Sequence, residues 1–553
     1  MLQINDLNIY FNDSKFTLDK ISFSLKKNQI IGIVGESGSG KSLCSLAIMG
    51  LLNSNAIVSG EIIYKDTNVL TLNETELQKI RGKEIAMIFQ DPMSSLNPTL
   101  TCGYQVAETL KQHTNLSNKE IYKEVITLFQ KVKLPRTKSI YDSYPHEISG
   151  GQKQRVMIAM AIACKPKVLI ADEPTTALDV TVQKEIINLL KELQSSEKMS
   201  IIFISHDLAL VSEITDYSIV MYKGKVVEKG NSKNIFKEPK ENYTKALINS
   251  KPNLSVRYKK LPTVSDFIDN KLDKTIITEK ERKKKHKTIY TKRPLLEIKN
   301  LKKEFIRRPY WFSEESKVVA VDDLTFNIYE GETLGLVGES GCGKTTLGRT
   351  ILQLEKATSG KIIYKGEDII KISKSNKKNL KKDIQIIFQD PYSSLNPKIT
   401  VGEAIIEPMK VHNILSSYKE RKEYVINLLQ KVGLEPVHFN RYPHEFSGGQ
   451  RQRIGIARTI SLQPKLIICD ESVSALDVSV QAQVLNLLNS LKSEYKFTYI
   501  FISHDLSIVK YMADQLLVMN EGKIEEMGDA DDIYKAPKTS YTKTLINAIP
   551  KGI

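Results

Sequence analysis

One short pattern occurs twice in this chain and constrains its fold more than any other feature. GESGSGKS at Gly35–Ser42 recurs as GESGCGKT at Gly338–Thr345, 303 residues later. Both copies satisfy G-x-x-x-x-G-K-[ST], a glycine-rich loop that follows a strand, opens a helix and binds phosphates. Glycines let the backbone approach the phosphates, and the helix start attracts negative charge. The repeat therefore predicts two nucleoside triphosphate sites.

Each loop assigns roles to particular side chains. Lys41 and Lys344 are expected at the β/γ-phosphates, and the hydroxyls of Ser42 and Thr345 are expected to bind Mg²⁺. The residues predicted to contact the nucleotide are Gly35, Glu36, Ser37, Gly38, Ser39, Gly40, Lys41 and Ser42, and in the second copy Gly338, Glu339, Ser340, Gly341, Cys342, Gly343, Lys344, Thr345 and Thr346.

Two further apolar runs follow each loop in the same order. VLIADE at 168–173 and LIICDE at 466–471 end on two acids, whereas IIFISHD at 201–207 and YIFISHD at 499–505 end on His-Asp. Short apolar runs that alternate with helical stretches predict an α/β fold with a mainly parallel sheet. Ligands of such sheets bind at the carboxyl ends of the strands, where these motifs fall.

The strand ends carry the candidate chemistry. Asp172 and Asp470 are expected to support the metal, while the following acids, Glu173 and Glu471, are placed to orient and deprotonate a water. The alternative is a solvated pair of acids. In the third run, His206 and His504 are expected at the γ-phosphate or, alternatively, to be structural. Gln90 and Gln389 follow the runs AMIFQ and QIIFQ and are candidates for sensing metal and γ-phosphate, which spacing alone leaves open.

Offsets of 298 to 303 residues between the copies indicate a duplication within the 553 residues. We predict two domains, 1–250 and 295–553, joined by a basic linker at 251–294. Residues 251–293 hold 14 Lys and Arg against 5 Asp and Glu, more than half of the net charge of +16. A solvated, partly disordered linker is expected; contact with anionic lipid or with nucleic acid is the alternative.

Composition excludes several classes of protein. No stretch of 18 residues is free of charge, so a membrane span is not expected, and the N-terminus lacks a basic-then-apolar signal. The five cysteines contain no C-x-x-C pair, which argues against a zinc site, a cluster or a disulfide framework. A location in the cytosol is predicted.

The segments ISGGQKQR at 148–155 and FSGGQRQR at 446–453 resemble the signature motif of ATP-binding-cassette ATPases. The resemblance implies two tandem P-loop domains, each a RecA-like core with a mainly parallel sheet, an antiparallel β part and a helical subdomain. It also implies that the signature of one domain closes over the ATP of the other, and that ALD at 177–179 and 475–477 forms a communicating loop. The signature residues are Ser149, Gly150, Gly151, Gln152, Ser447, Gly448, Gly449 and Gln450.

FQDPMSSLNP at 89–98, FQDPYSSLNP at 388–397, YPHE before each signature, and the tails NYTKALI and SYTKTLI resemble the oligopeptide/dipeptide/nickel importers. The chain resembles a fusion of their two different ATPase subunits. The implied partners are two transmembrane permease subunits and an extracytoplasmic substrate-binding protein, with ATP and Mg²⁺ as cofactors. The implied location is peripheral, at the cytoplasmic face of the plasma membrane. The tails contain no cysteine, so no iron–sulfur cluster is expected, and nucleic acid is not an expected partner. The alternative is a soluble tandem-cassette ATPase acting on ribosomes or nucleic acid.

Ser472, Cys342 and two aligned phenylalanines lead to further expectations. Ser472 stands where the first copy has Pro174, so the loop after Glu471 is expected to be looser. Cys342 lies beside a lysine and a helix start, where its thiol pKa should fall and alkylation should be fast unless MgATP blocks it. Phe11 and Phe305 align as candidates for stacking on adenine, with core packing as the alternative.

Overall fold

The computed structural model describes residues 1–11, 14–176, 178–307, 316–390, 392, 394–474 and 476–550. It divides into two compact units, one formed mainly by Met1–Asn249 and the other mainly by Leu272–Ile549. Each unit contains a six-stranded and a four-stranded sheet. Within the described residues, no helix has the length and apolar character needed to cross a bilayer.

The central sheet of the first unit is parallel except for one antiparallel edge strand, β10. The inner strands of this sheet are buried on both faces and consist mainly of apolar residues such as Ile, Val, Leu and Phe, whereas the edge strand β10 is partly exposed. Their spatial order is β10 (Lys225–Asn231), β9 (Tyr217–Tyr222), β3 (Ile30–Val34), β8 (Ser200–Ile204), β7 (Val168–Asp172) and β6 (Ile85–Ile88).

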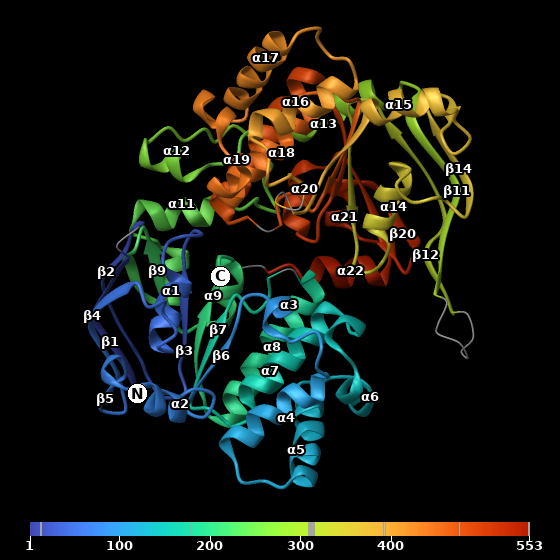
Figure 1. Cartoon of the computed structure of the whole chain (residues 1–553). Coiled ribbons are helices and arrows are strands. Elements are labelled where there is room, and N and C mark those ends of the chain that lie inside the picture. The colour runs from blue at the N-terminus through green and yellow to red at the C-terminus, as the bar shows by residue number, and fades with distance from the viewer. Residues whose placement is uncertain are drawn as a thin grey trace. The chain divides into compact units, whose positions relative to one another are not determined.

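A smaller antiparallel sheet and a group of helices lie on either side of this central sheet (Figure 1). The smaller sheet has the order β2 (Ser14–Leu25), β1 (Leu2–Phe11), β4 (Ala56–Tyr64) and β5 (Thr67–Asn68). The helices of the first unit, on both sides of the central sheet, are α1 (Lys41–Ile48), α2 (Glu74–Ile80), α3 (Pro92–Ser95), α4 (Cys102–His113), α5 (Asn118–Lys131), α6 (Thr137–Asp142), α7 (Gly150–Ile162), α8 (Val180–Glu197), α9 (Leu208–Ile214), α10 (Ser232–Lys237), α11 (Asn242–Ser250) and α12 (Val264–Ile268).

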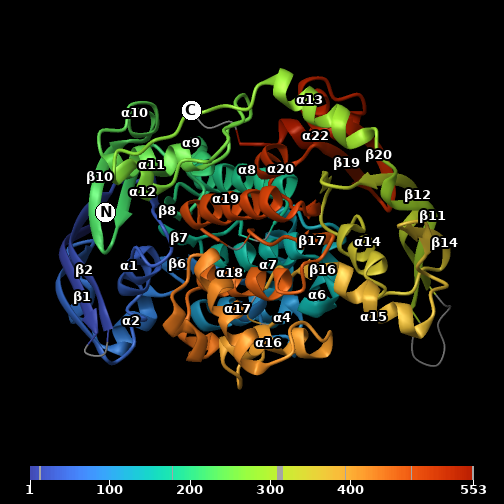
Figure 2. The same cartoon turned by 90° about the horizontal axis from the view of Figure 1, so that it is seen from above.

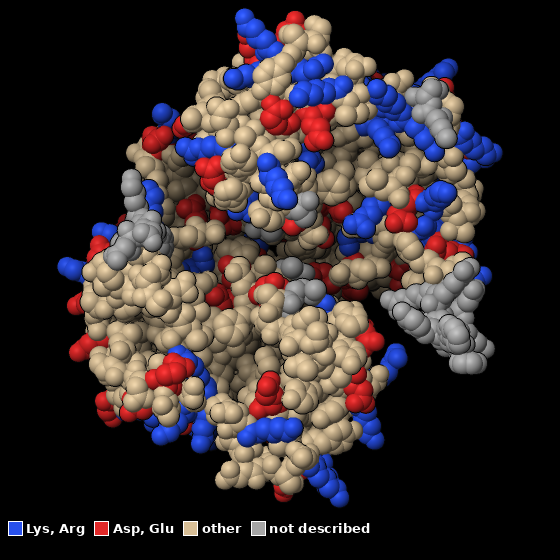
Figure 3. Space-filling model, in the orientation of Figure 1, with Lys and Arg blue, Asp and Glu red and all other residues tan. Residues whose placement is uncertain are grey.

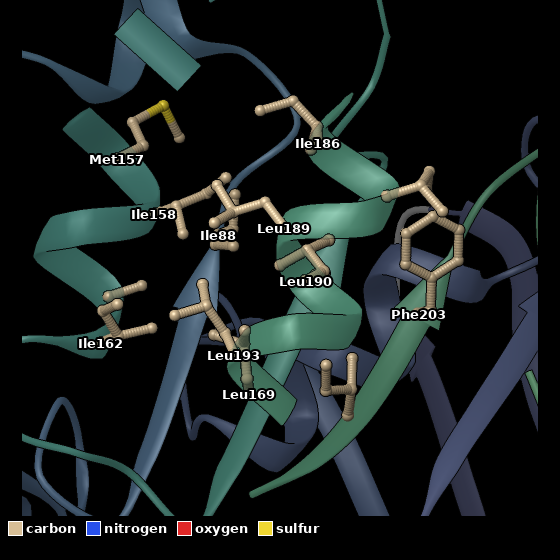
Figure 4. Close-up of a cluster of buried hydrophobic side chains, with 14 of the residues drawn as sticks. Ile88, Met157, Ile158, Ile162, Leu169, Ile186, Leu189, Leu190, Leu193 and Phe203 are labelled. Carbon is tan, nitrogen blue, oxygen red and sulfur yellow. The ribbon is translucent and has the colours of Figure 1, made fainter. Parts of the chain in front are cut away.

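Alternating side chains of the central strands enter two separate cores. On one face, Leu169 of β7 and Phe203 of β8 pack with Ile158 of α7 and Leu190 of α8 (Figure 4). On the other face, their neighbours pack against α1 and the antiparallel sheet. Burying both faces fixes the register of the strands, because a slip by one residue would exchange the two cores.

The second unit repeats this architecture. Its central sheet has the order β16 (Ile384–Ile387), β17 (Leu466–Asp470), β18 (Thr498–Ile502), β13 (Thr333–Val337), β19 (Gln515–Asn520) and β20 (Lys523–Asp529), and its antiparallel sheet the order β12 (Ser316–Tyr329), β11 (Pro294–Arg307), β14 (Ser359–Tyr364) and β15 (Glu367–Asp368). The helices are α13 (Glu279–Tyr290), α14 (Lys344–Ile351), α15 (Lys374–Asp383), α16 (Val401–Val411), α17 (Tyr418–Lys431), α18 (Gly448–Ile460), α19 (Val478–Tyr495), α20 (Leu506–Met512), α21 (Ala530–Lys535) and α22 (Ser540–Asn547). Helices α16, α17 and α18 lie together (Figure 2). The predicted α/β fold, mainly parallel with an antiparallel part and a helical group in each copy, is confirmed.

Part of the basic segment is folded against the second unit. Arg282 of α13 is only 8% exposed, and its guanidinium donates to the carboxylates of Asp529 (2.7 Å) and Asp531 (2.5 Å). Arg257 also pairs with Asp531, at 2.9 Å. These contacts differ from the solvated, partly disordered linker expected from composition, because acidic side chains of the second unit neutralise the basic ones. On the face drawn in Figure 3, Lys and Arg are likewise interspersed with Asp and Glu.

His286 lies at the centre of this docked helix. Its ring nitrogens are 3.3 Å from a carboxylate oxygen of Asp514 and 3.2 Å from one of Asp529. Lys285 and Lys492 also contact Asp514, at 2.8 and 3.0 Å. Burial alone would lower the pKa of His286, but the two carboxylates outweigh it and raise that pKa.

We expect the docking of α13 to weaken as pH rises. Because the pKa of His286 is raised in the folded state, its contribution is complete below the ordinary histidine pKa of about 6.5 and is lost as pH passes the raised value. Hydrogen exchange of the amides of 282–290, corrected for intrinsic rates, should show protection that falls with rising pH in the parent chain and changes less in His286→Gln. Equal pH profiles in the two proteins would contradict this assignment.

Candidate nucleotide site

The predicted phosphate loops join β3 to α1 and β13 to α14, at the carboxyl ends of the central strands. Gly40 and Gly343, the residues before the two helices, have φ of 102° and 105°, a region that favours glycine. A Cβ on Gly35 would lie 2.2 Å from the carbonyl oxygen of Met221. The backbone conformation therefore favours glycine at Gly40 and Gly343, and the close approach of Met221 leaves no room for a side chain at Gly35.

The loop lysines are buried and bonded to their own loops. The ammonium of Lys41 donates to the carbonyl oxygens of Gly35 and Glu36, both at 2.8 Å. In the second copy, Lys344 makes the same two bonds at 2.8 Å, to the carbonyls of residues 338 and 339. The carbonyl of Ser39 also accepts from the amide of residue 224 in the β9–β10 turn.

The first acid of each pair lies beside the loop hydroxyl. Asp172, at the end of β7, accepts from Ser42, and burial raises its pKa to about 6. Its other oxygen, Oδ1, is buried without a partner among the described residues. In the second copy, the hydroxyl of Thr345 donates to Asp470 at 3.2 Å, and burial raises the pKa of Asp470 as well.

The second acid of each pair contacts the predicted glutamine and histidine. The carboxylate of Glu173 accepts from Nε2 of Gln90 (3.0 Å) and lies 3.2 Å from Nδ1 of His206. Burial alone would raise the pKa of Glu173, but His206 and Lys41 together lower it to about 2. Its backbone φ is +48°, a strained value for a residue other than glycine.

The second copy has the same arrangement. Glu471 accepts from Nε2 of Gln389 (2.8 Å), lies 3.4 Å from Nδ1 of His504 and has the same φ of +48°. Burial alone would raise the pKa of Glu471, but His504 and Lys344 together lower it. The structure thus brings the predicted Gln, Glu and His together in each copy, although they come from three separate strand ends.

The signature residues open helices. Ser149 caps α7, and Ser447 caps α18, each accepting the amide of the glutamine three residues later, Gln152 or Gln450. Each serine and its glutamine form a capping box at the helix start. Ala177 and Ala475 of the ALD motifs, and Pro391 and Ser393 of the second FQDP motif, lie outside the described residues.

The expectation for Cys342 is wrong. This residue is buried, with its sulfur 3.7 Å from the ammonium of Lys344. Burial raises the pKa of the thiol more than the neighbouring lysine lowers it. Fast alkylation is therefore no longer expected.

The loop after Glu471 has the same backbone anchor as its counterpart in the first copy. The amide of Glu471 donates to the carbonyl of Ile502, as the amide of Glu173 does to that of Ile204.

The adenine candidates differ from each other. Phe11 is partly buried against the core below the antiparallel sheet. Phe305 is 37% exposed and has the ammonium of Lys303 over its ring, at 4.5 Å from the centroid. Stacking on adenine stays a prediction for both.

Two site residues were missed from the sequence. Tyr243 and Tyr541 accept hydrogen bonds from the phosphate loops, at the amides of Glu36 (3.1 Å) and Glu339 (3.0 Å). Their occurrence in both tails, within NYTKALI and SYTKTLI, was the available signal.

Comparisons with known proteins find matches in both copies. The model of the family described as ABC transporter matches residues 18–176 and 321–474. The model described as oligopeptide/dipeptide transporter, C-terminal region, matches residues 227–267 and 526–552. Proteins named glutathione import ATP-binding protein GsiA, from Shigella dysenteriae and Salmonella typhimurium, are each 43% identical over 100% of this chain and 89% of their own length. One from Pectobacterium atrosepticum is 41% identical with the same coverage. A solved dimeric ATP-binding cassette, MJ0796 with ADP and Pi, is 26% identical and covers 42% of this chain and 98% of its own, with a TM-score of 0.39.

Proposed function

Since the chain belongs to the ABC transporter family and is the ATP-hydrolysing subunit of an importer, we propose that both of its cassettes hydrolyse MgATP and that the imported solute is glutathione or another small peptide. The choice of solute is based on the names of the relatives. The observation that supports two working sites is the repeated Gln–Glu–His cluster beside a complete phosphate loop. The alternative, a soluble factor acting on ribosomes or nucleic acid, is not favoured. We take 1–250 and 295–553 as the two ATPase domains.

We propose that Ser42 with Asp172, and Thr345 with Asp470, hold Mg²⁺. The buried, unpartnered Oδ1 of Asp172 fits a cation, as does a carboxylate whose pKa is raised by burial. Hydroxyl and carboxylate oxygens are the ligands that Mg²⁺ prefers. When bound, the cation would neutralise charge on the β- and γ-phosphates.

The charges of the site residues support a mechanism in which Glu173 activates a water. Glu173 is ionised at neutral pH and faces Gln90 and His206, so it can accept the proton of a water that attacks the γ-phosphate. His206, whose pKa is raised mainly by Glu173 against the effect of burial, holds the carboxylate in place. Lys41 supplies positive charge to the phosphates. Glu471, Gln389, His504 and Lys344 take these roles in the second cassette.

We extend the proposal to the signature residues, whose role rests on the family resemblance alone. In that family the signature of one cassette serves the nucleotide of another. A hydroxyl and glycine amides at a helix start suit a γ-phosphate. Ser149, Gly150, Gly151 and Gln152, and Ser447, Gly448, Gly449 and Gln450, are accordingly proposed as ATP contacts.

Import requires membrane partners, and we propose where one of them docks. A cavity of about 450 Å³ in the second unit is lined by Phe388, the residue before Gln389, and by Leu354, Val411 and Arg458 among others. Leu354 and Val411 are 61% and 57% exposed. Exposed apolar side chains with polar groups around them are typical of a protein-binding surface. We propose a permease subunit as its occupant, a substrate-binding protein outside, and a peripheral location at the cytoplasmic face of the plasma membrane.

The test is an affinity capture of the tagged full chain from detergent-solubilised membranes, with partners identified by mass spectrometry. Two polytopic permeases are expected with the parent chain, and at least one should be lost with Leu354→Asp plus Val411→Asp. ATP binding by that variant, measured separately, should be unchanged. Recovery of ribosomal proteins without any permease would refute the proposed function.

A further inference from the structure

Both cassettes bring their C-terminal tail back to their own phosphate loop. The hydroxyl of Tyr243, in the first turn of α11, accepts the amide of Glu36 at 3.1 Å. The hydroxyl of Tyr541, in the first turn of α22, accepts the amide of Glu339 at 3.0 Å. The same long-range bond thus occurs twice, once in each unit, at equivalent positions of the duplication.

The tails are held in place by a glutamate on an edge strand of the central sheet in each copy. Glu228 of β10 accepts from the amides of Lys240 and Glu241, at 3.0 and 3.3 Å. Glu526 of β20, 8% exposed, accepts from the amide of Lys538 at 3.1 Å. Each tail helix is therefore anchored to the central sheet immediately before the tyrosine.

The tyrosine and the loop lysine hold opposite ends of one peptide group. The amide of Glu36 and the carbonyl of Gly35 belong to the same peptide plane. Tyr243 binds its N–H, and Lys41 binds its C=O at 2.8 Å. Because Gly35 has no Cβ, this peptide would otherwise rotate at little steric cost. Fixing the plane also fixes the carbonyl that orients the lysine.

We propose that Tyr243 and Tyr541 are positioning residues for ATP binding, which set the conformation of each phosphate loop from the C-terminal tail. This inference rests on the proposed assignment of residues 35–42 and 338–345 as the phosphate sites. It gives the tail region a role in the affinity for nucleotide, in addition to any other contact that it makes.

The two tyrosines are braced differently. The ring of Tyr243 packs on that of Tyr222, with centroids 4.1 Å apart, whereas Asn520 stands at the equivalent position of the second copy. Tyr243 is also the more buried of the two. We expect the loop of the first cassette to be held more firmly.

The test compares Tyr243→Phe plus Tyr541→Phe with a matched control, Tyr64→Phe plus Tyr364→Phe. Tyr64 and Tyr364 lie in the antiparallel sheets, and their hydroxyls donate to Glu84 (2.8 Å) and Asp383 (3.1 Å). For the tail variant, Kd for MgATP of the full chain and KM of the assembled transporter should rise about three- to tenfold, the effect of one lost hydrogen bond. Its kcat should stay within about twofold, since loop contacts made equally in the ground and transition states affect binding alone. The control should leave Kd and KM unchanged.

Lys41→Met plus Lys344→Met separates this inference from the proposed site. If the lysine variant loses MgATP but the tail variant binds it normally, the positioning role is refuted and the site stands. If the lysine variant itself binds MgATP normally, the site is refuted. A tail variant whose affinity falls only together with its melting temperature, to the same extent as the control's, would also overturn the positioning role.

Discussion

Glu173→Gln together with Glu471→Gln is expected to lower steady-state ATP turnover by about 10²- to 10⁴-fold, the usual contribution of a general base. The carboxylate of Glu173 is ionised, with a pKa near 2, and lies within hydrogen-bond reach of Gln90 and His206. A glutamine keeps the shape of the side chain but cannot accept a proton. MgATP should still bind, and import should stop.

Turnover is measured as phosphate release by the assembled transporter, and binding as Kd of the full chain. Glu192→Gln is the control, since Glu192 pairs only with the exposed Lys133 in the described structure and is itself 56% exposed. Phosphate release or uptake near the parent level in the double variant would show that neither glutamate acts as the base. The single variants Glu173→Gln and Glu471→Gln report whether the two sites contribute equally.

Lys41→Met plus Lys344→Met is expected to weaken MgATP binding by about 10- to 100-fold at each site, the effect of losing a charged hydrogen-bond donor. Both lysines are about 5% exposed and point into their own loops, where two carbonyl oxygens orient each ammonium. Binding is measured by titration calorimetry on the full chain, and folding by its melting temperature.

Lys65→Met plus Lys365→Met is the matched control. These lysines also occur once in each copy, and they pair with Glu84 and Asp383 at 2.7 and 2.6 Å, but they are about half exposed. Exposed ion pairs contribute little, so the control should bind MgATP as the parent does. Equal affinity of the loop-lysine variant and this control would contradict the assignment of the phosphate sites.

Much of the fold and of the site could be predicted from sequence because the signals are local. A buried strand, a glycine-rich turn and a helix start lie within about 15 residues in each copy, and the two copies agree. The acids and histidines end apolar runs, and parallel strands bring such ends to one edge of the sheet. The clustering of Glu173 with Gln90 and His206 followed from that rule.

The docking of the basic segment could not be predicted from its own composition. Arg282 and Asp529 are 247 residues apart, and neither side of this contact is unusual alone. A comparison of the two copies could have indicated this docking, since Asp529 and Asp531 stand where the first copy has Asn231 and Lys233. The acidic replacements occur only in the cassette that receives α13.

The reactivity of the Cys342 thiol could not be predicted from its sequence neighbours either. Its neighbours in sequence, a lysine and a helix start, favour the thiolate, whereas burial in the folded loop disfavours it. Desolvation depends on packing from distant segments, which the sequence pattern does not contain.

By itself, the sequence determined that this protein is a duplicated α/β ATPase and which side chains are proposed to contact the phosphates, since both follow from short motifs and their order. Only the tertiary structure decided which groups hold those motifs in place. Tyr243 reaches the loop across 207 residues of chain, and α13 finds its acidic partners across still more. Such contacts depend on the burial and hydrogen bonding of groups brought together by the folded sheet, and no local pattern encodes them.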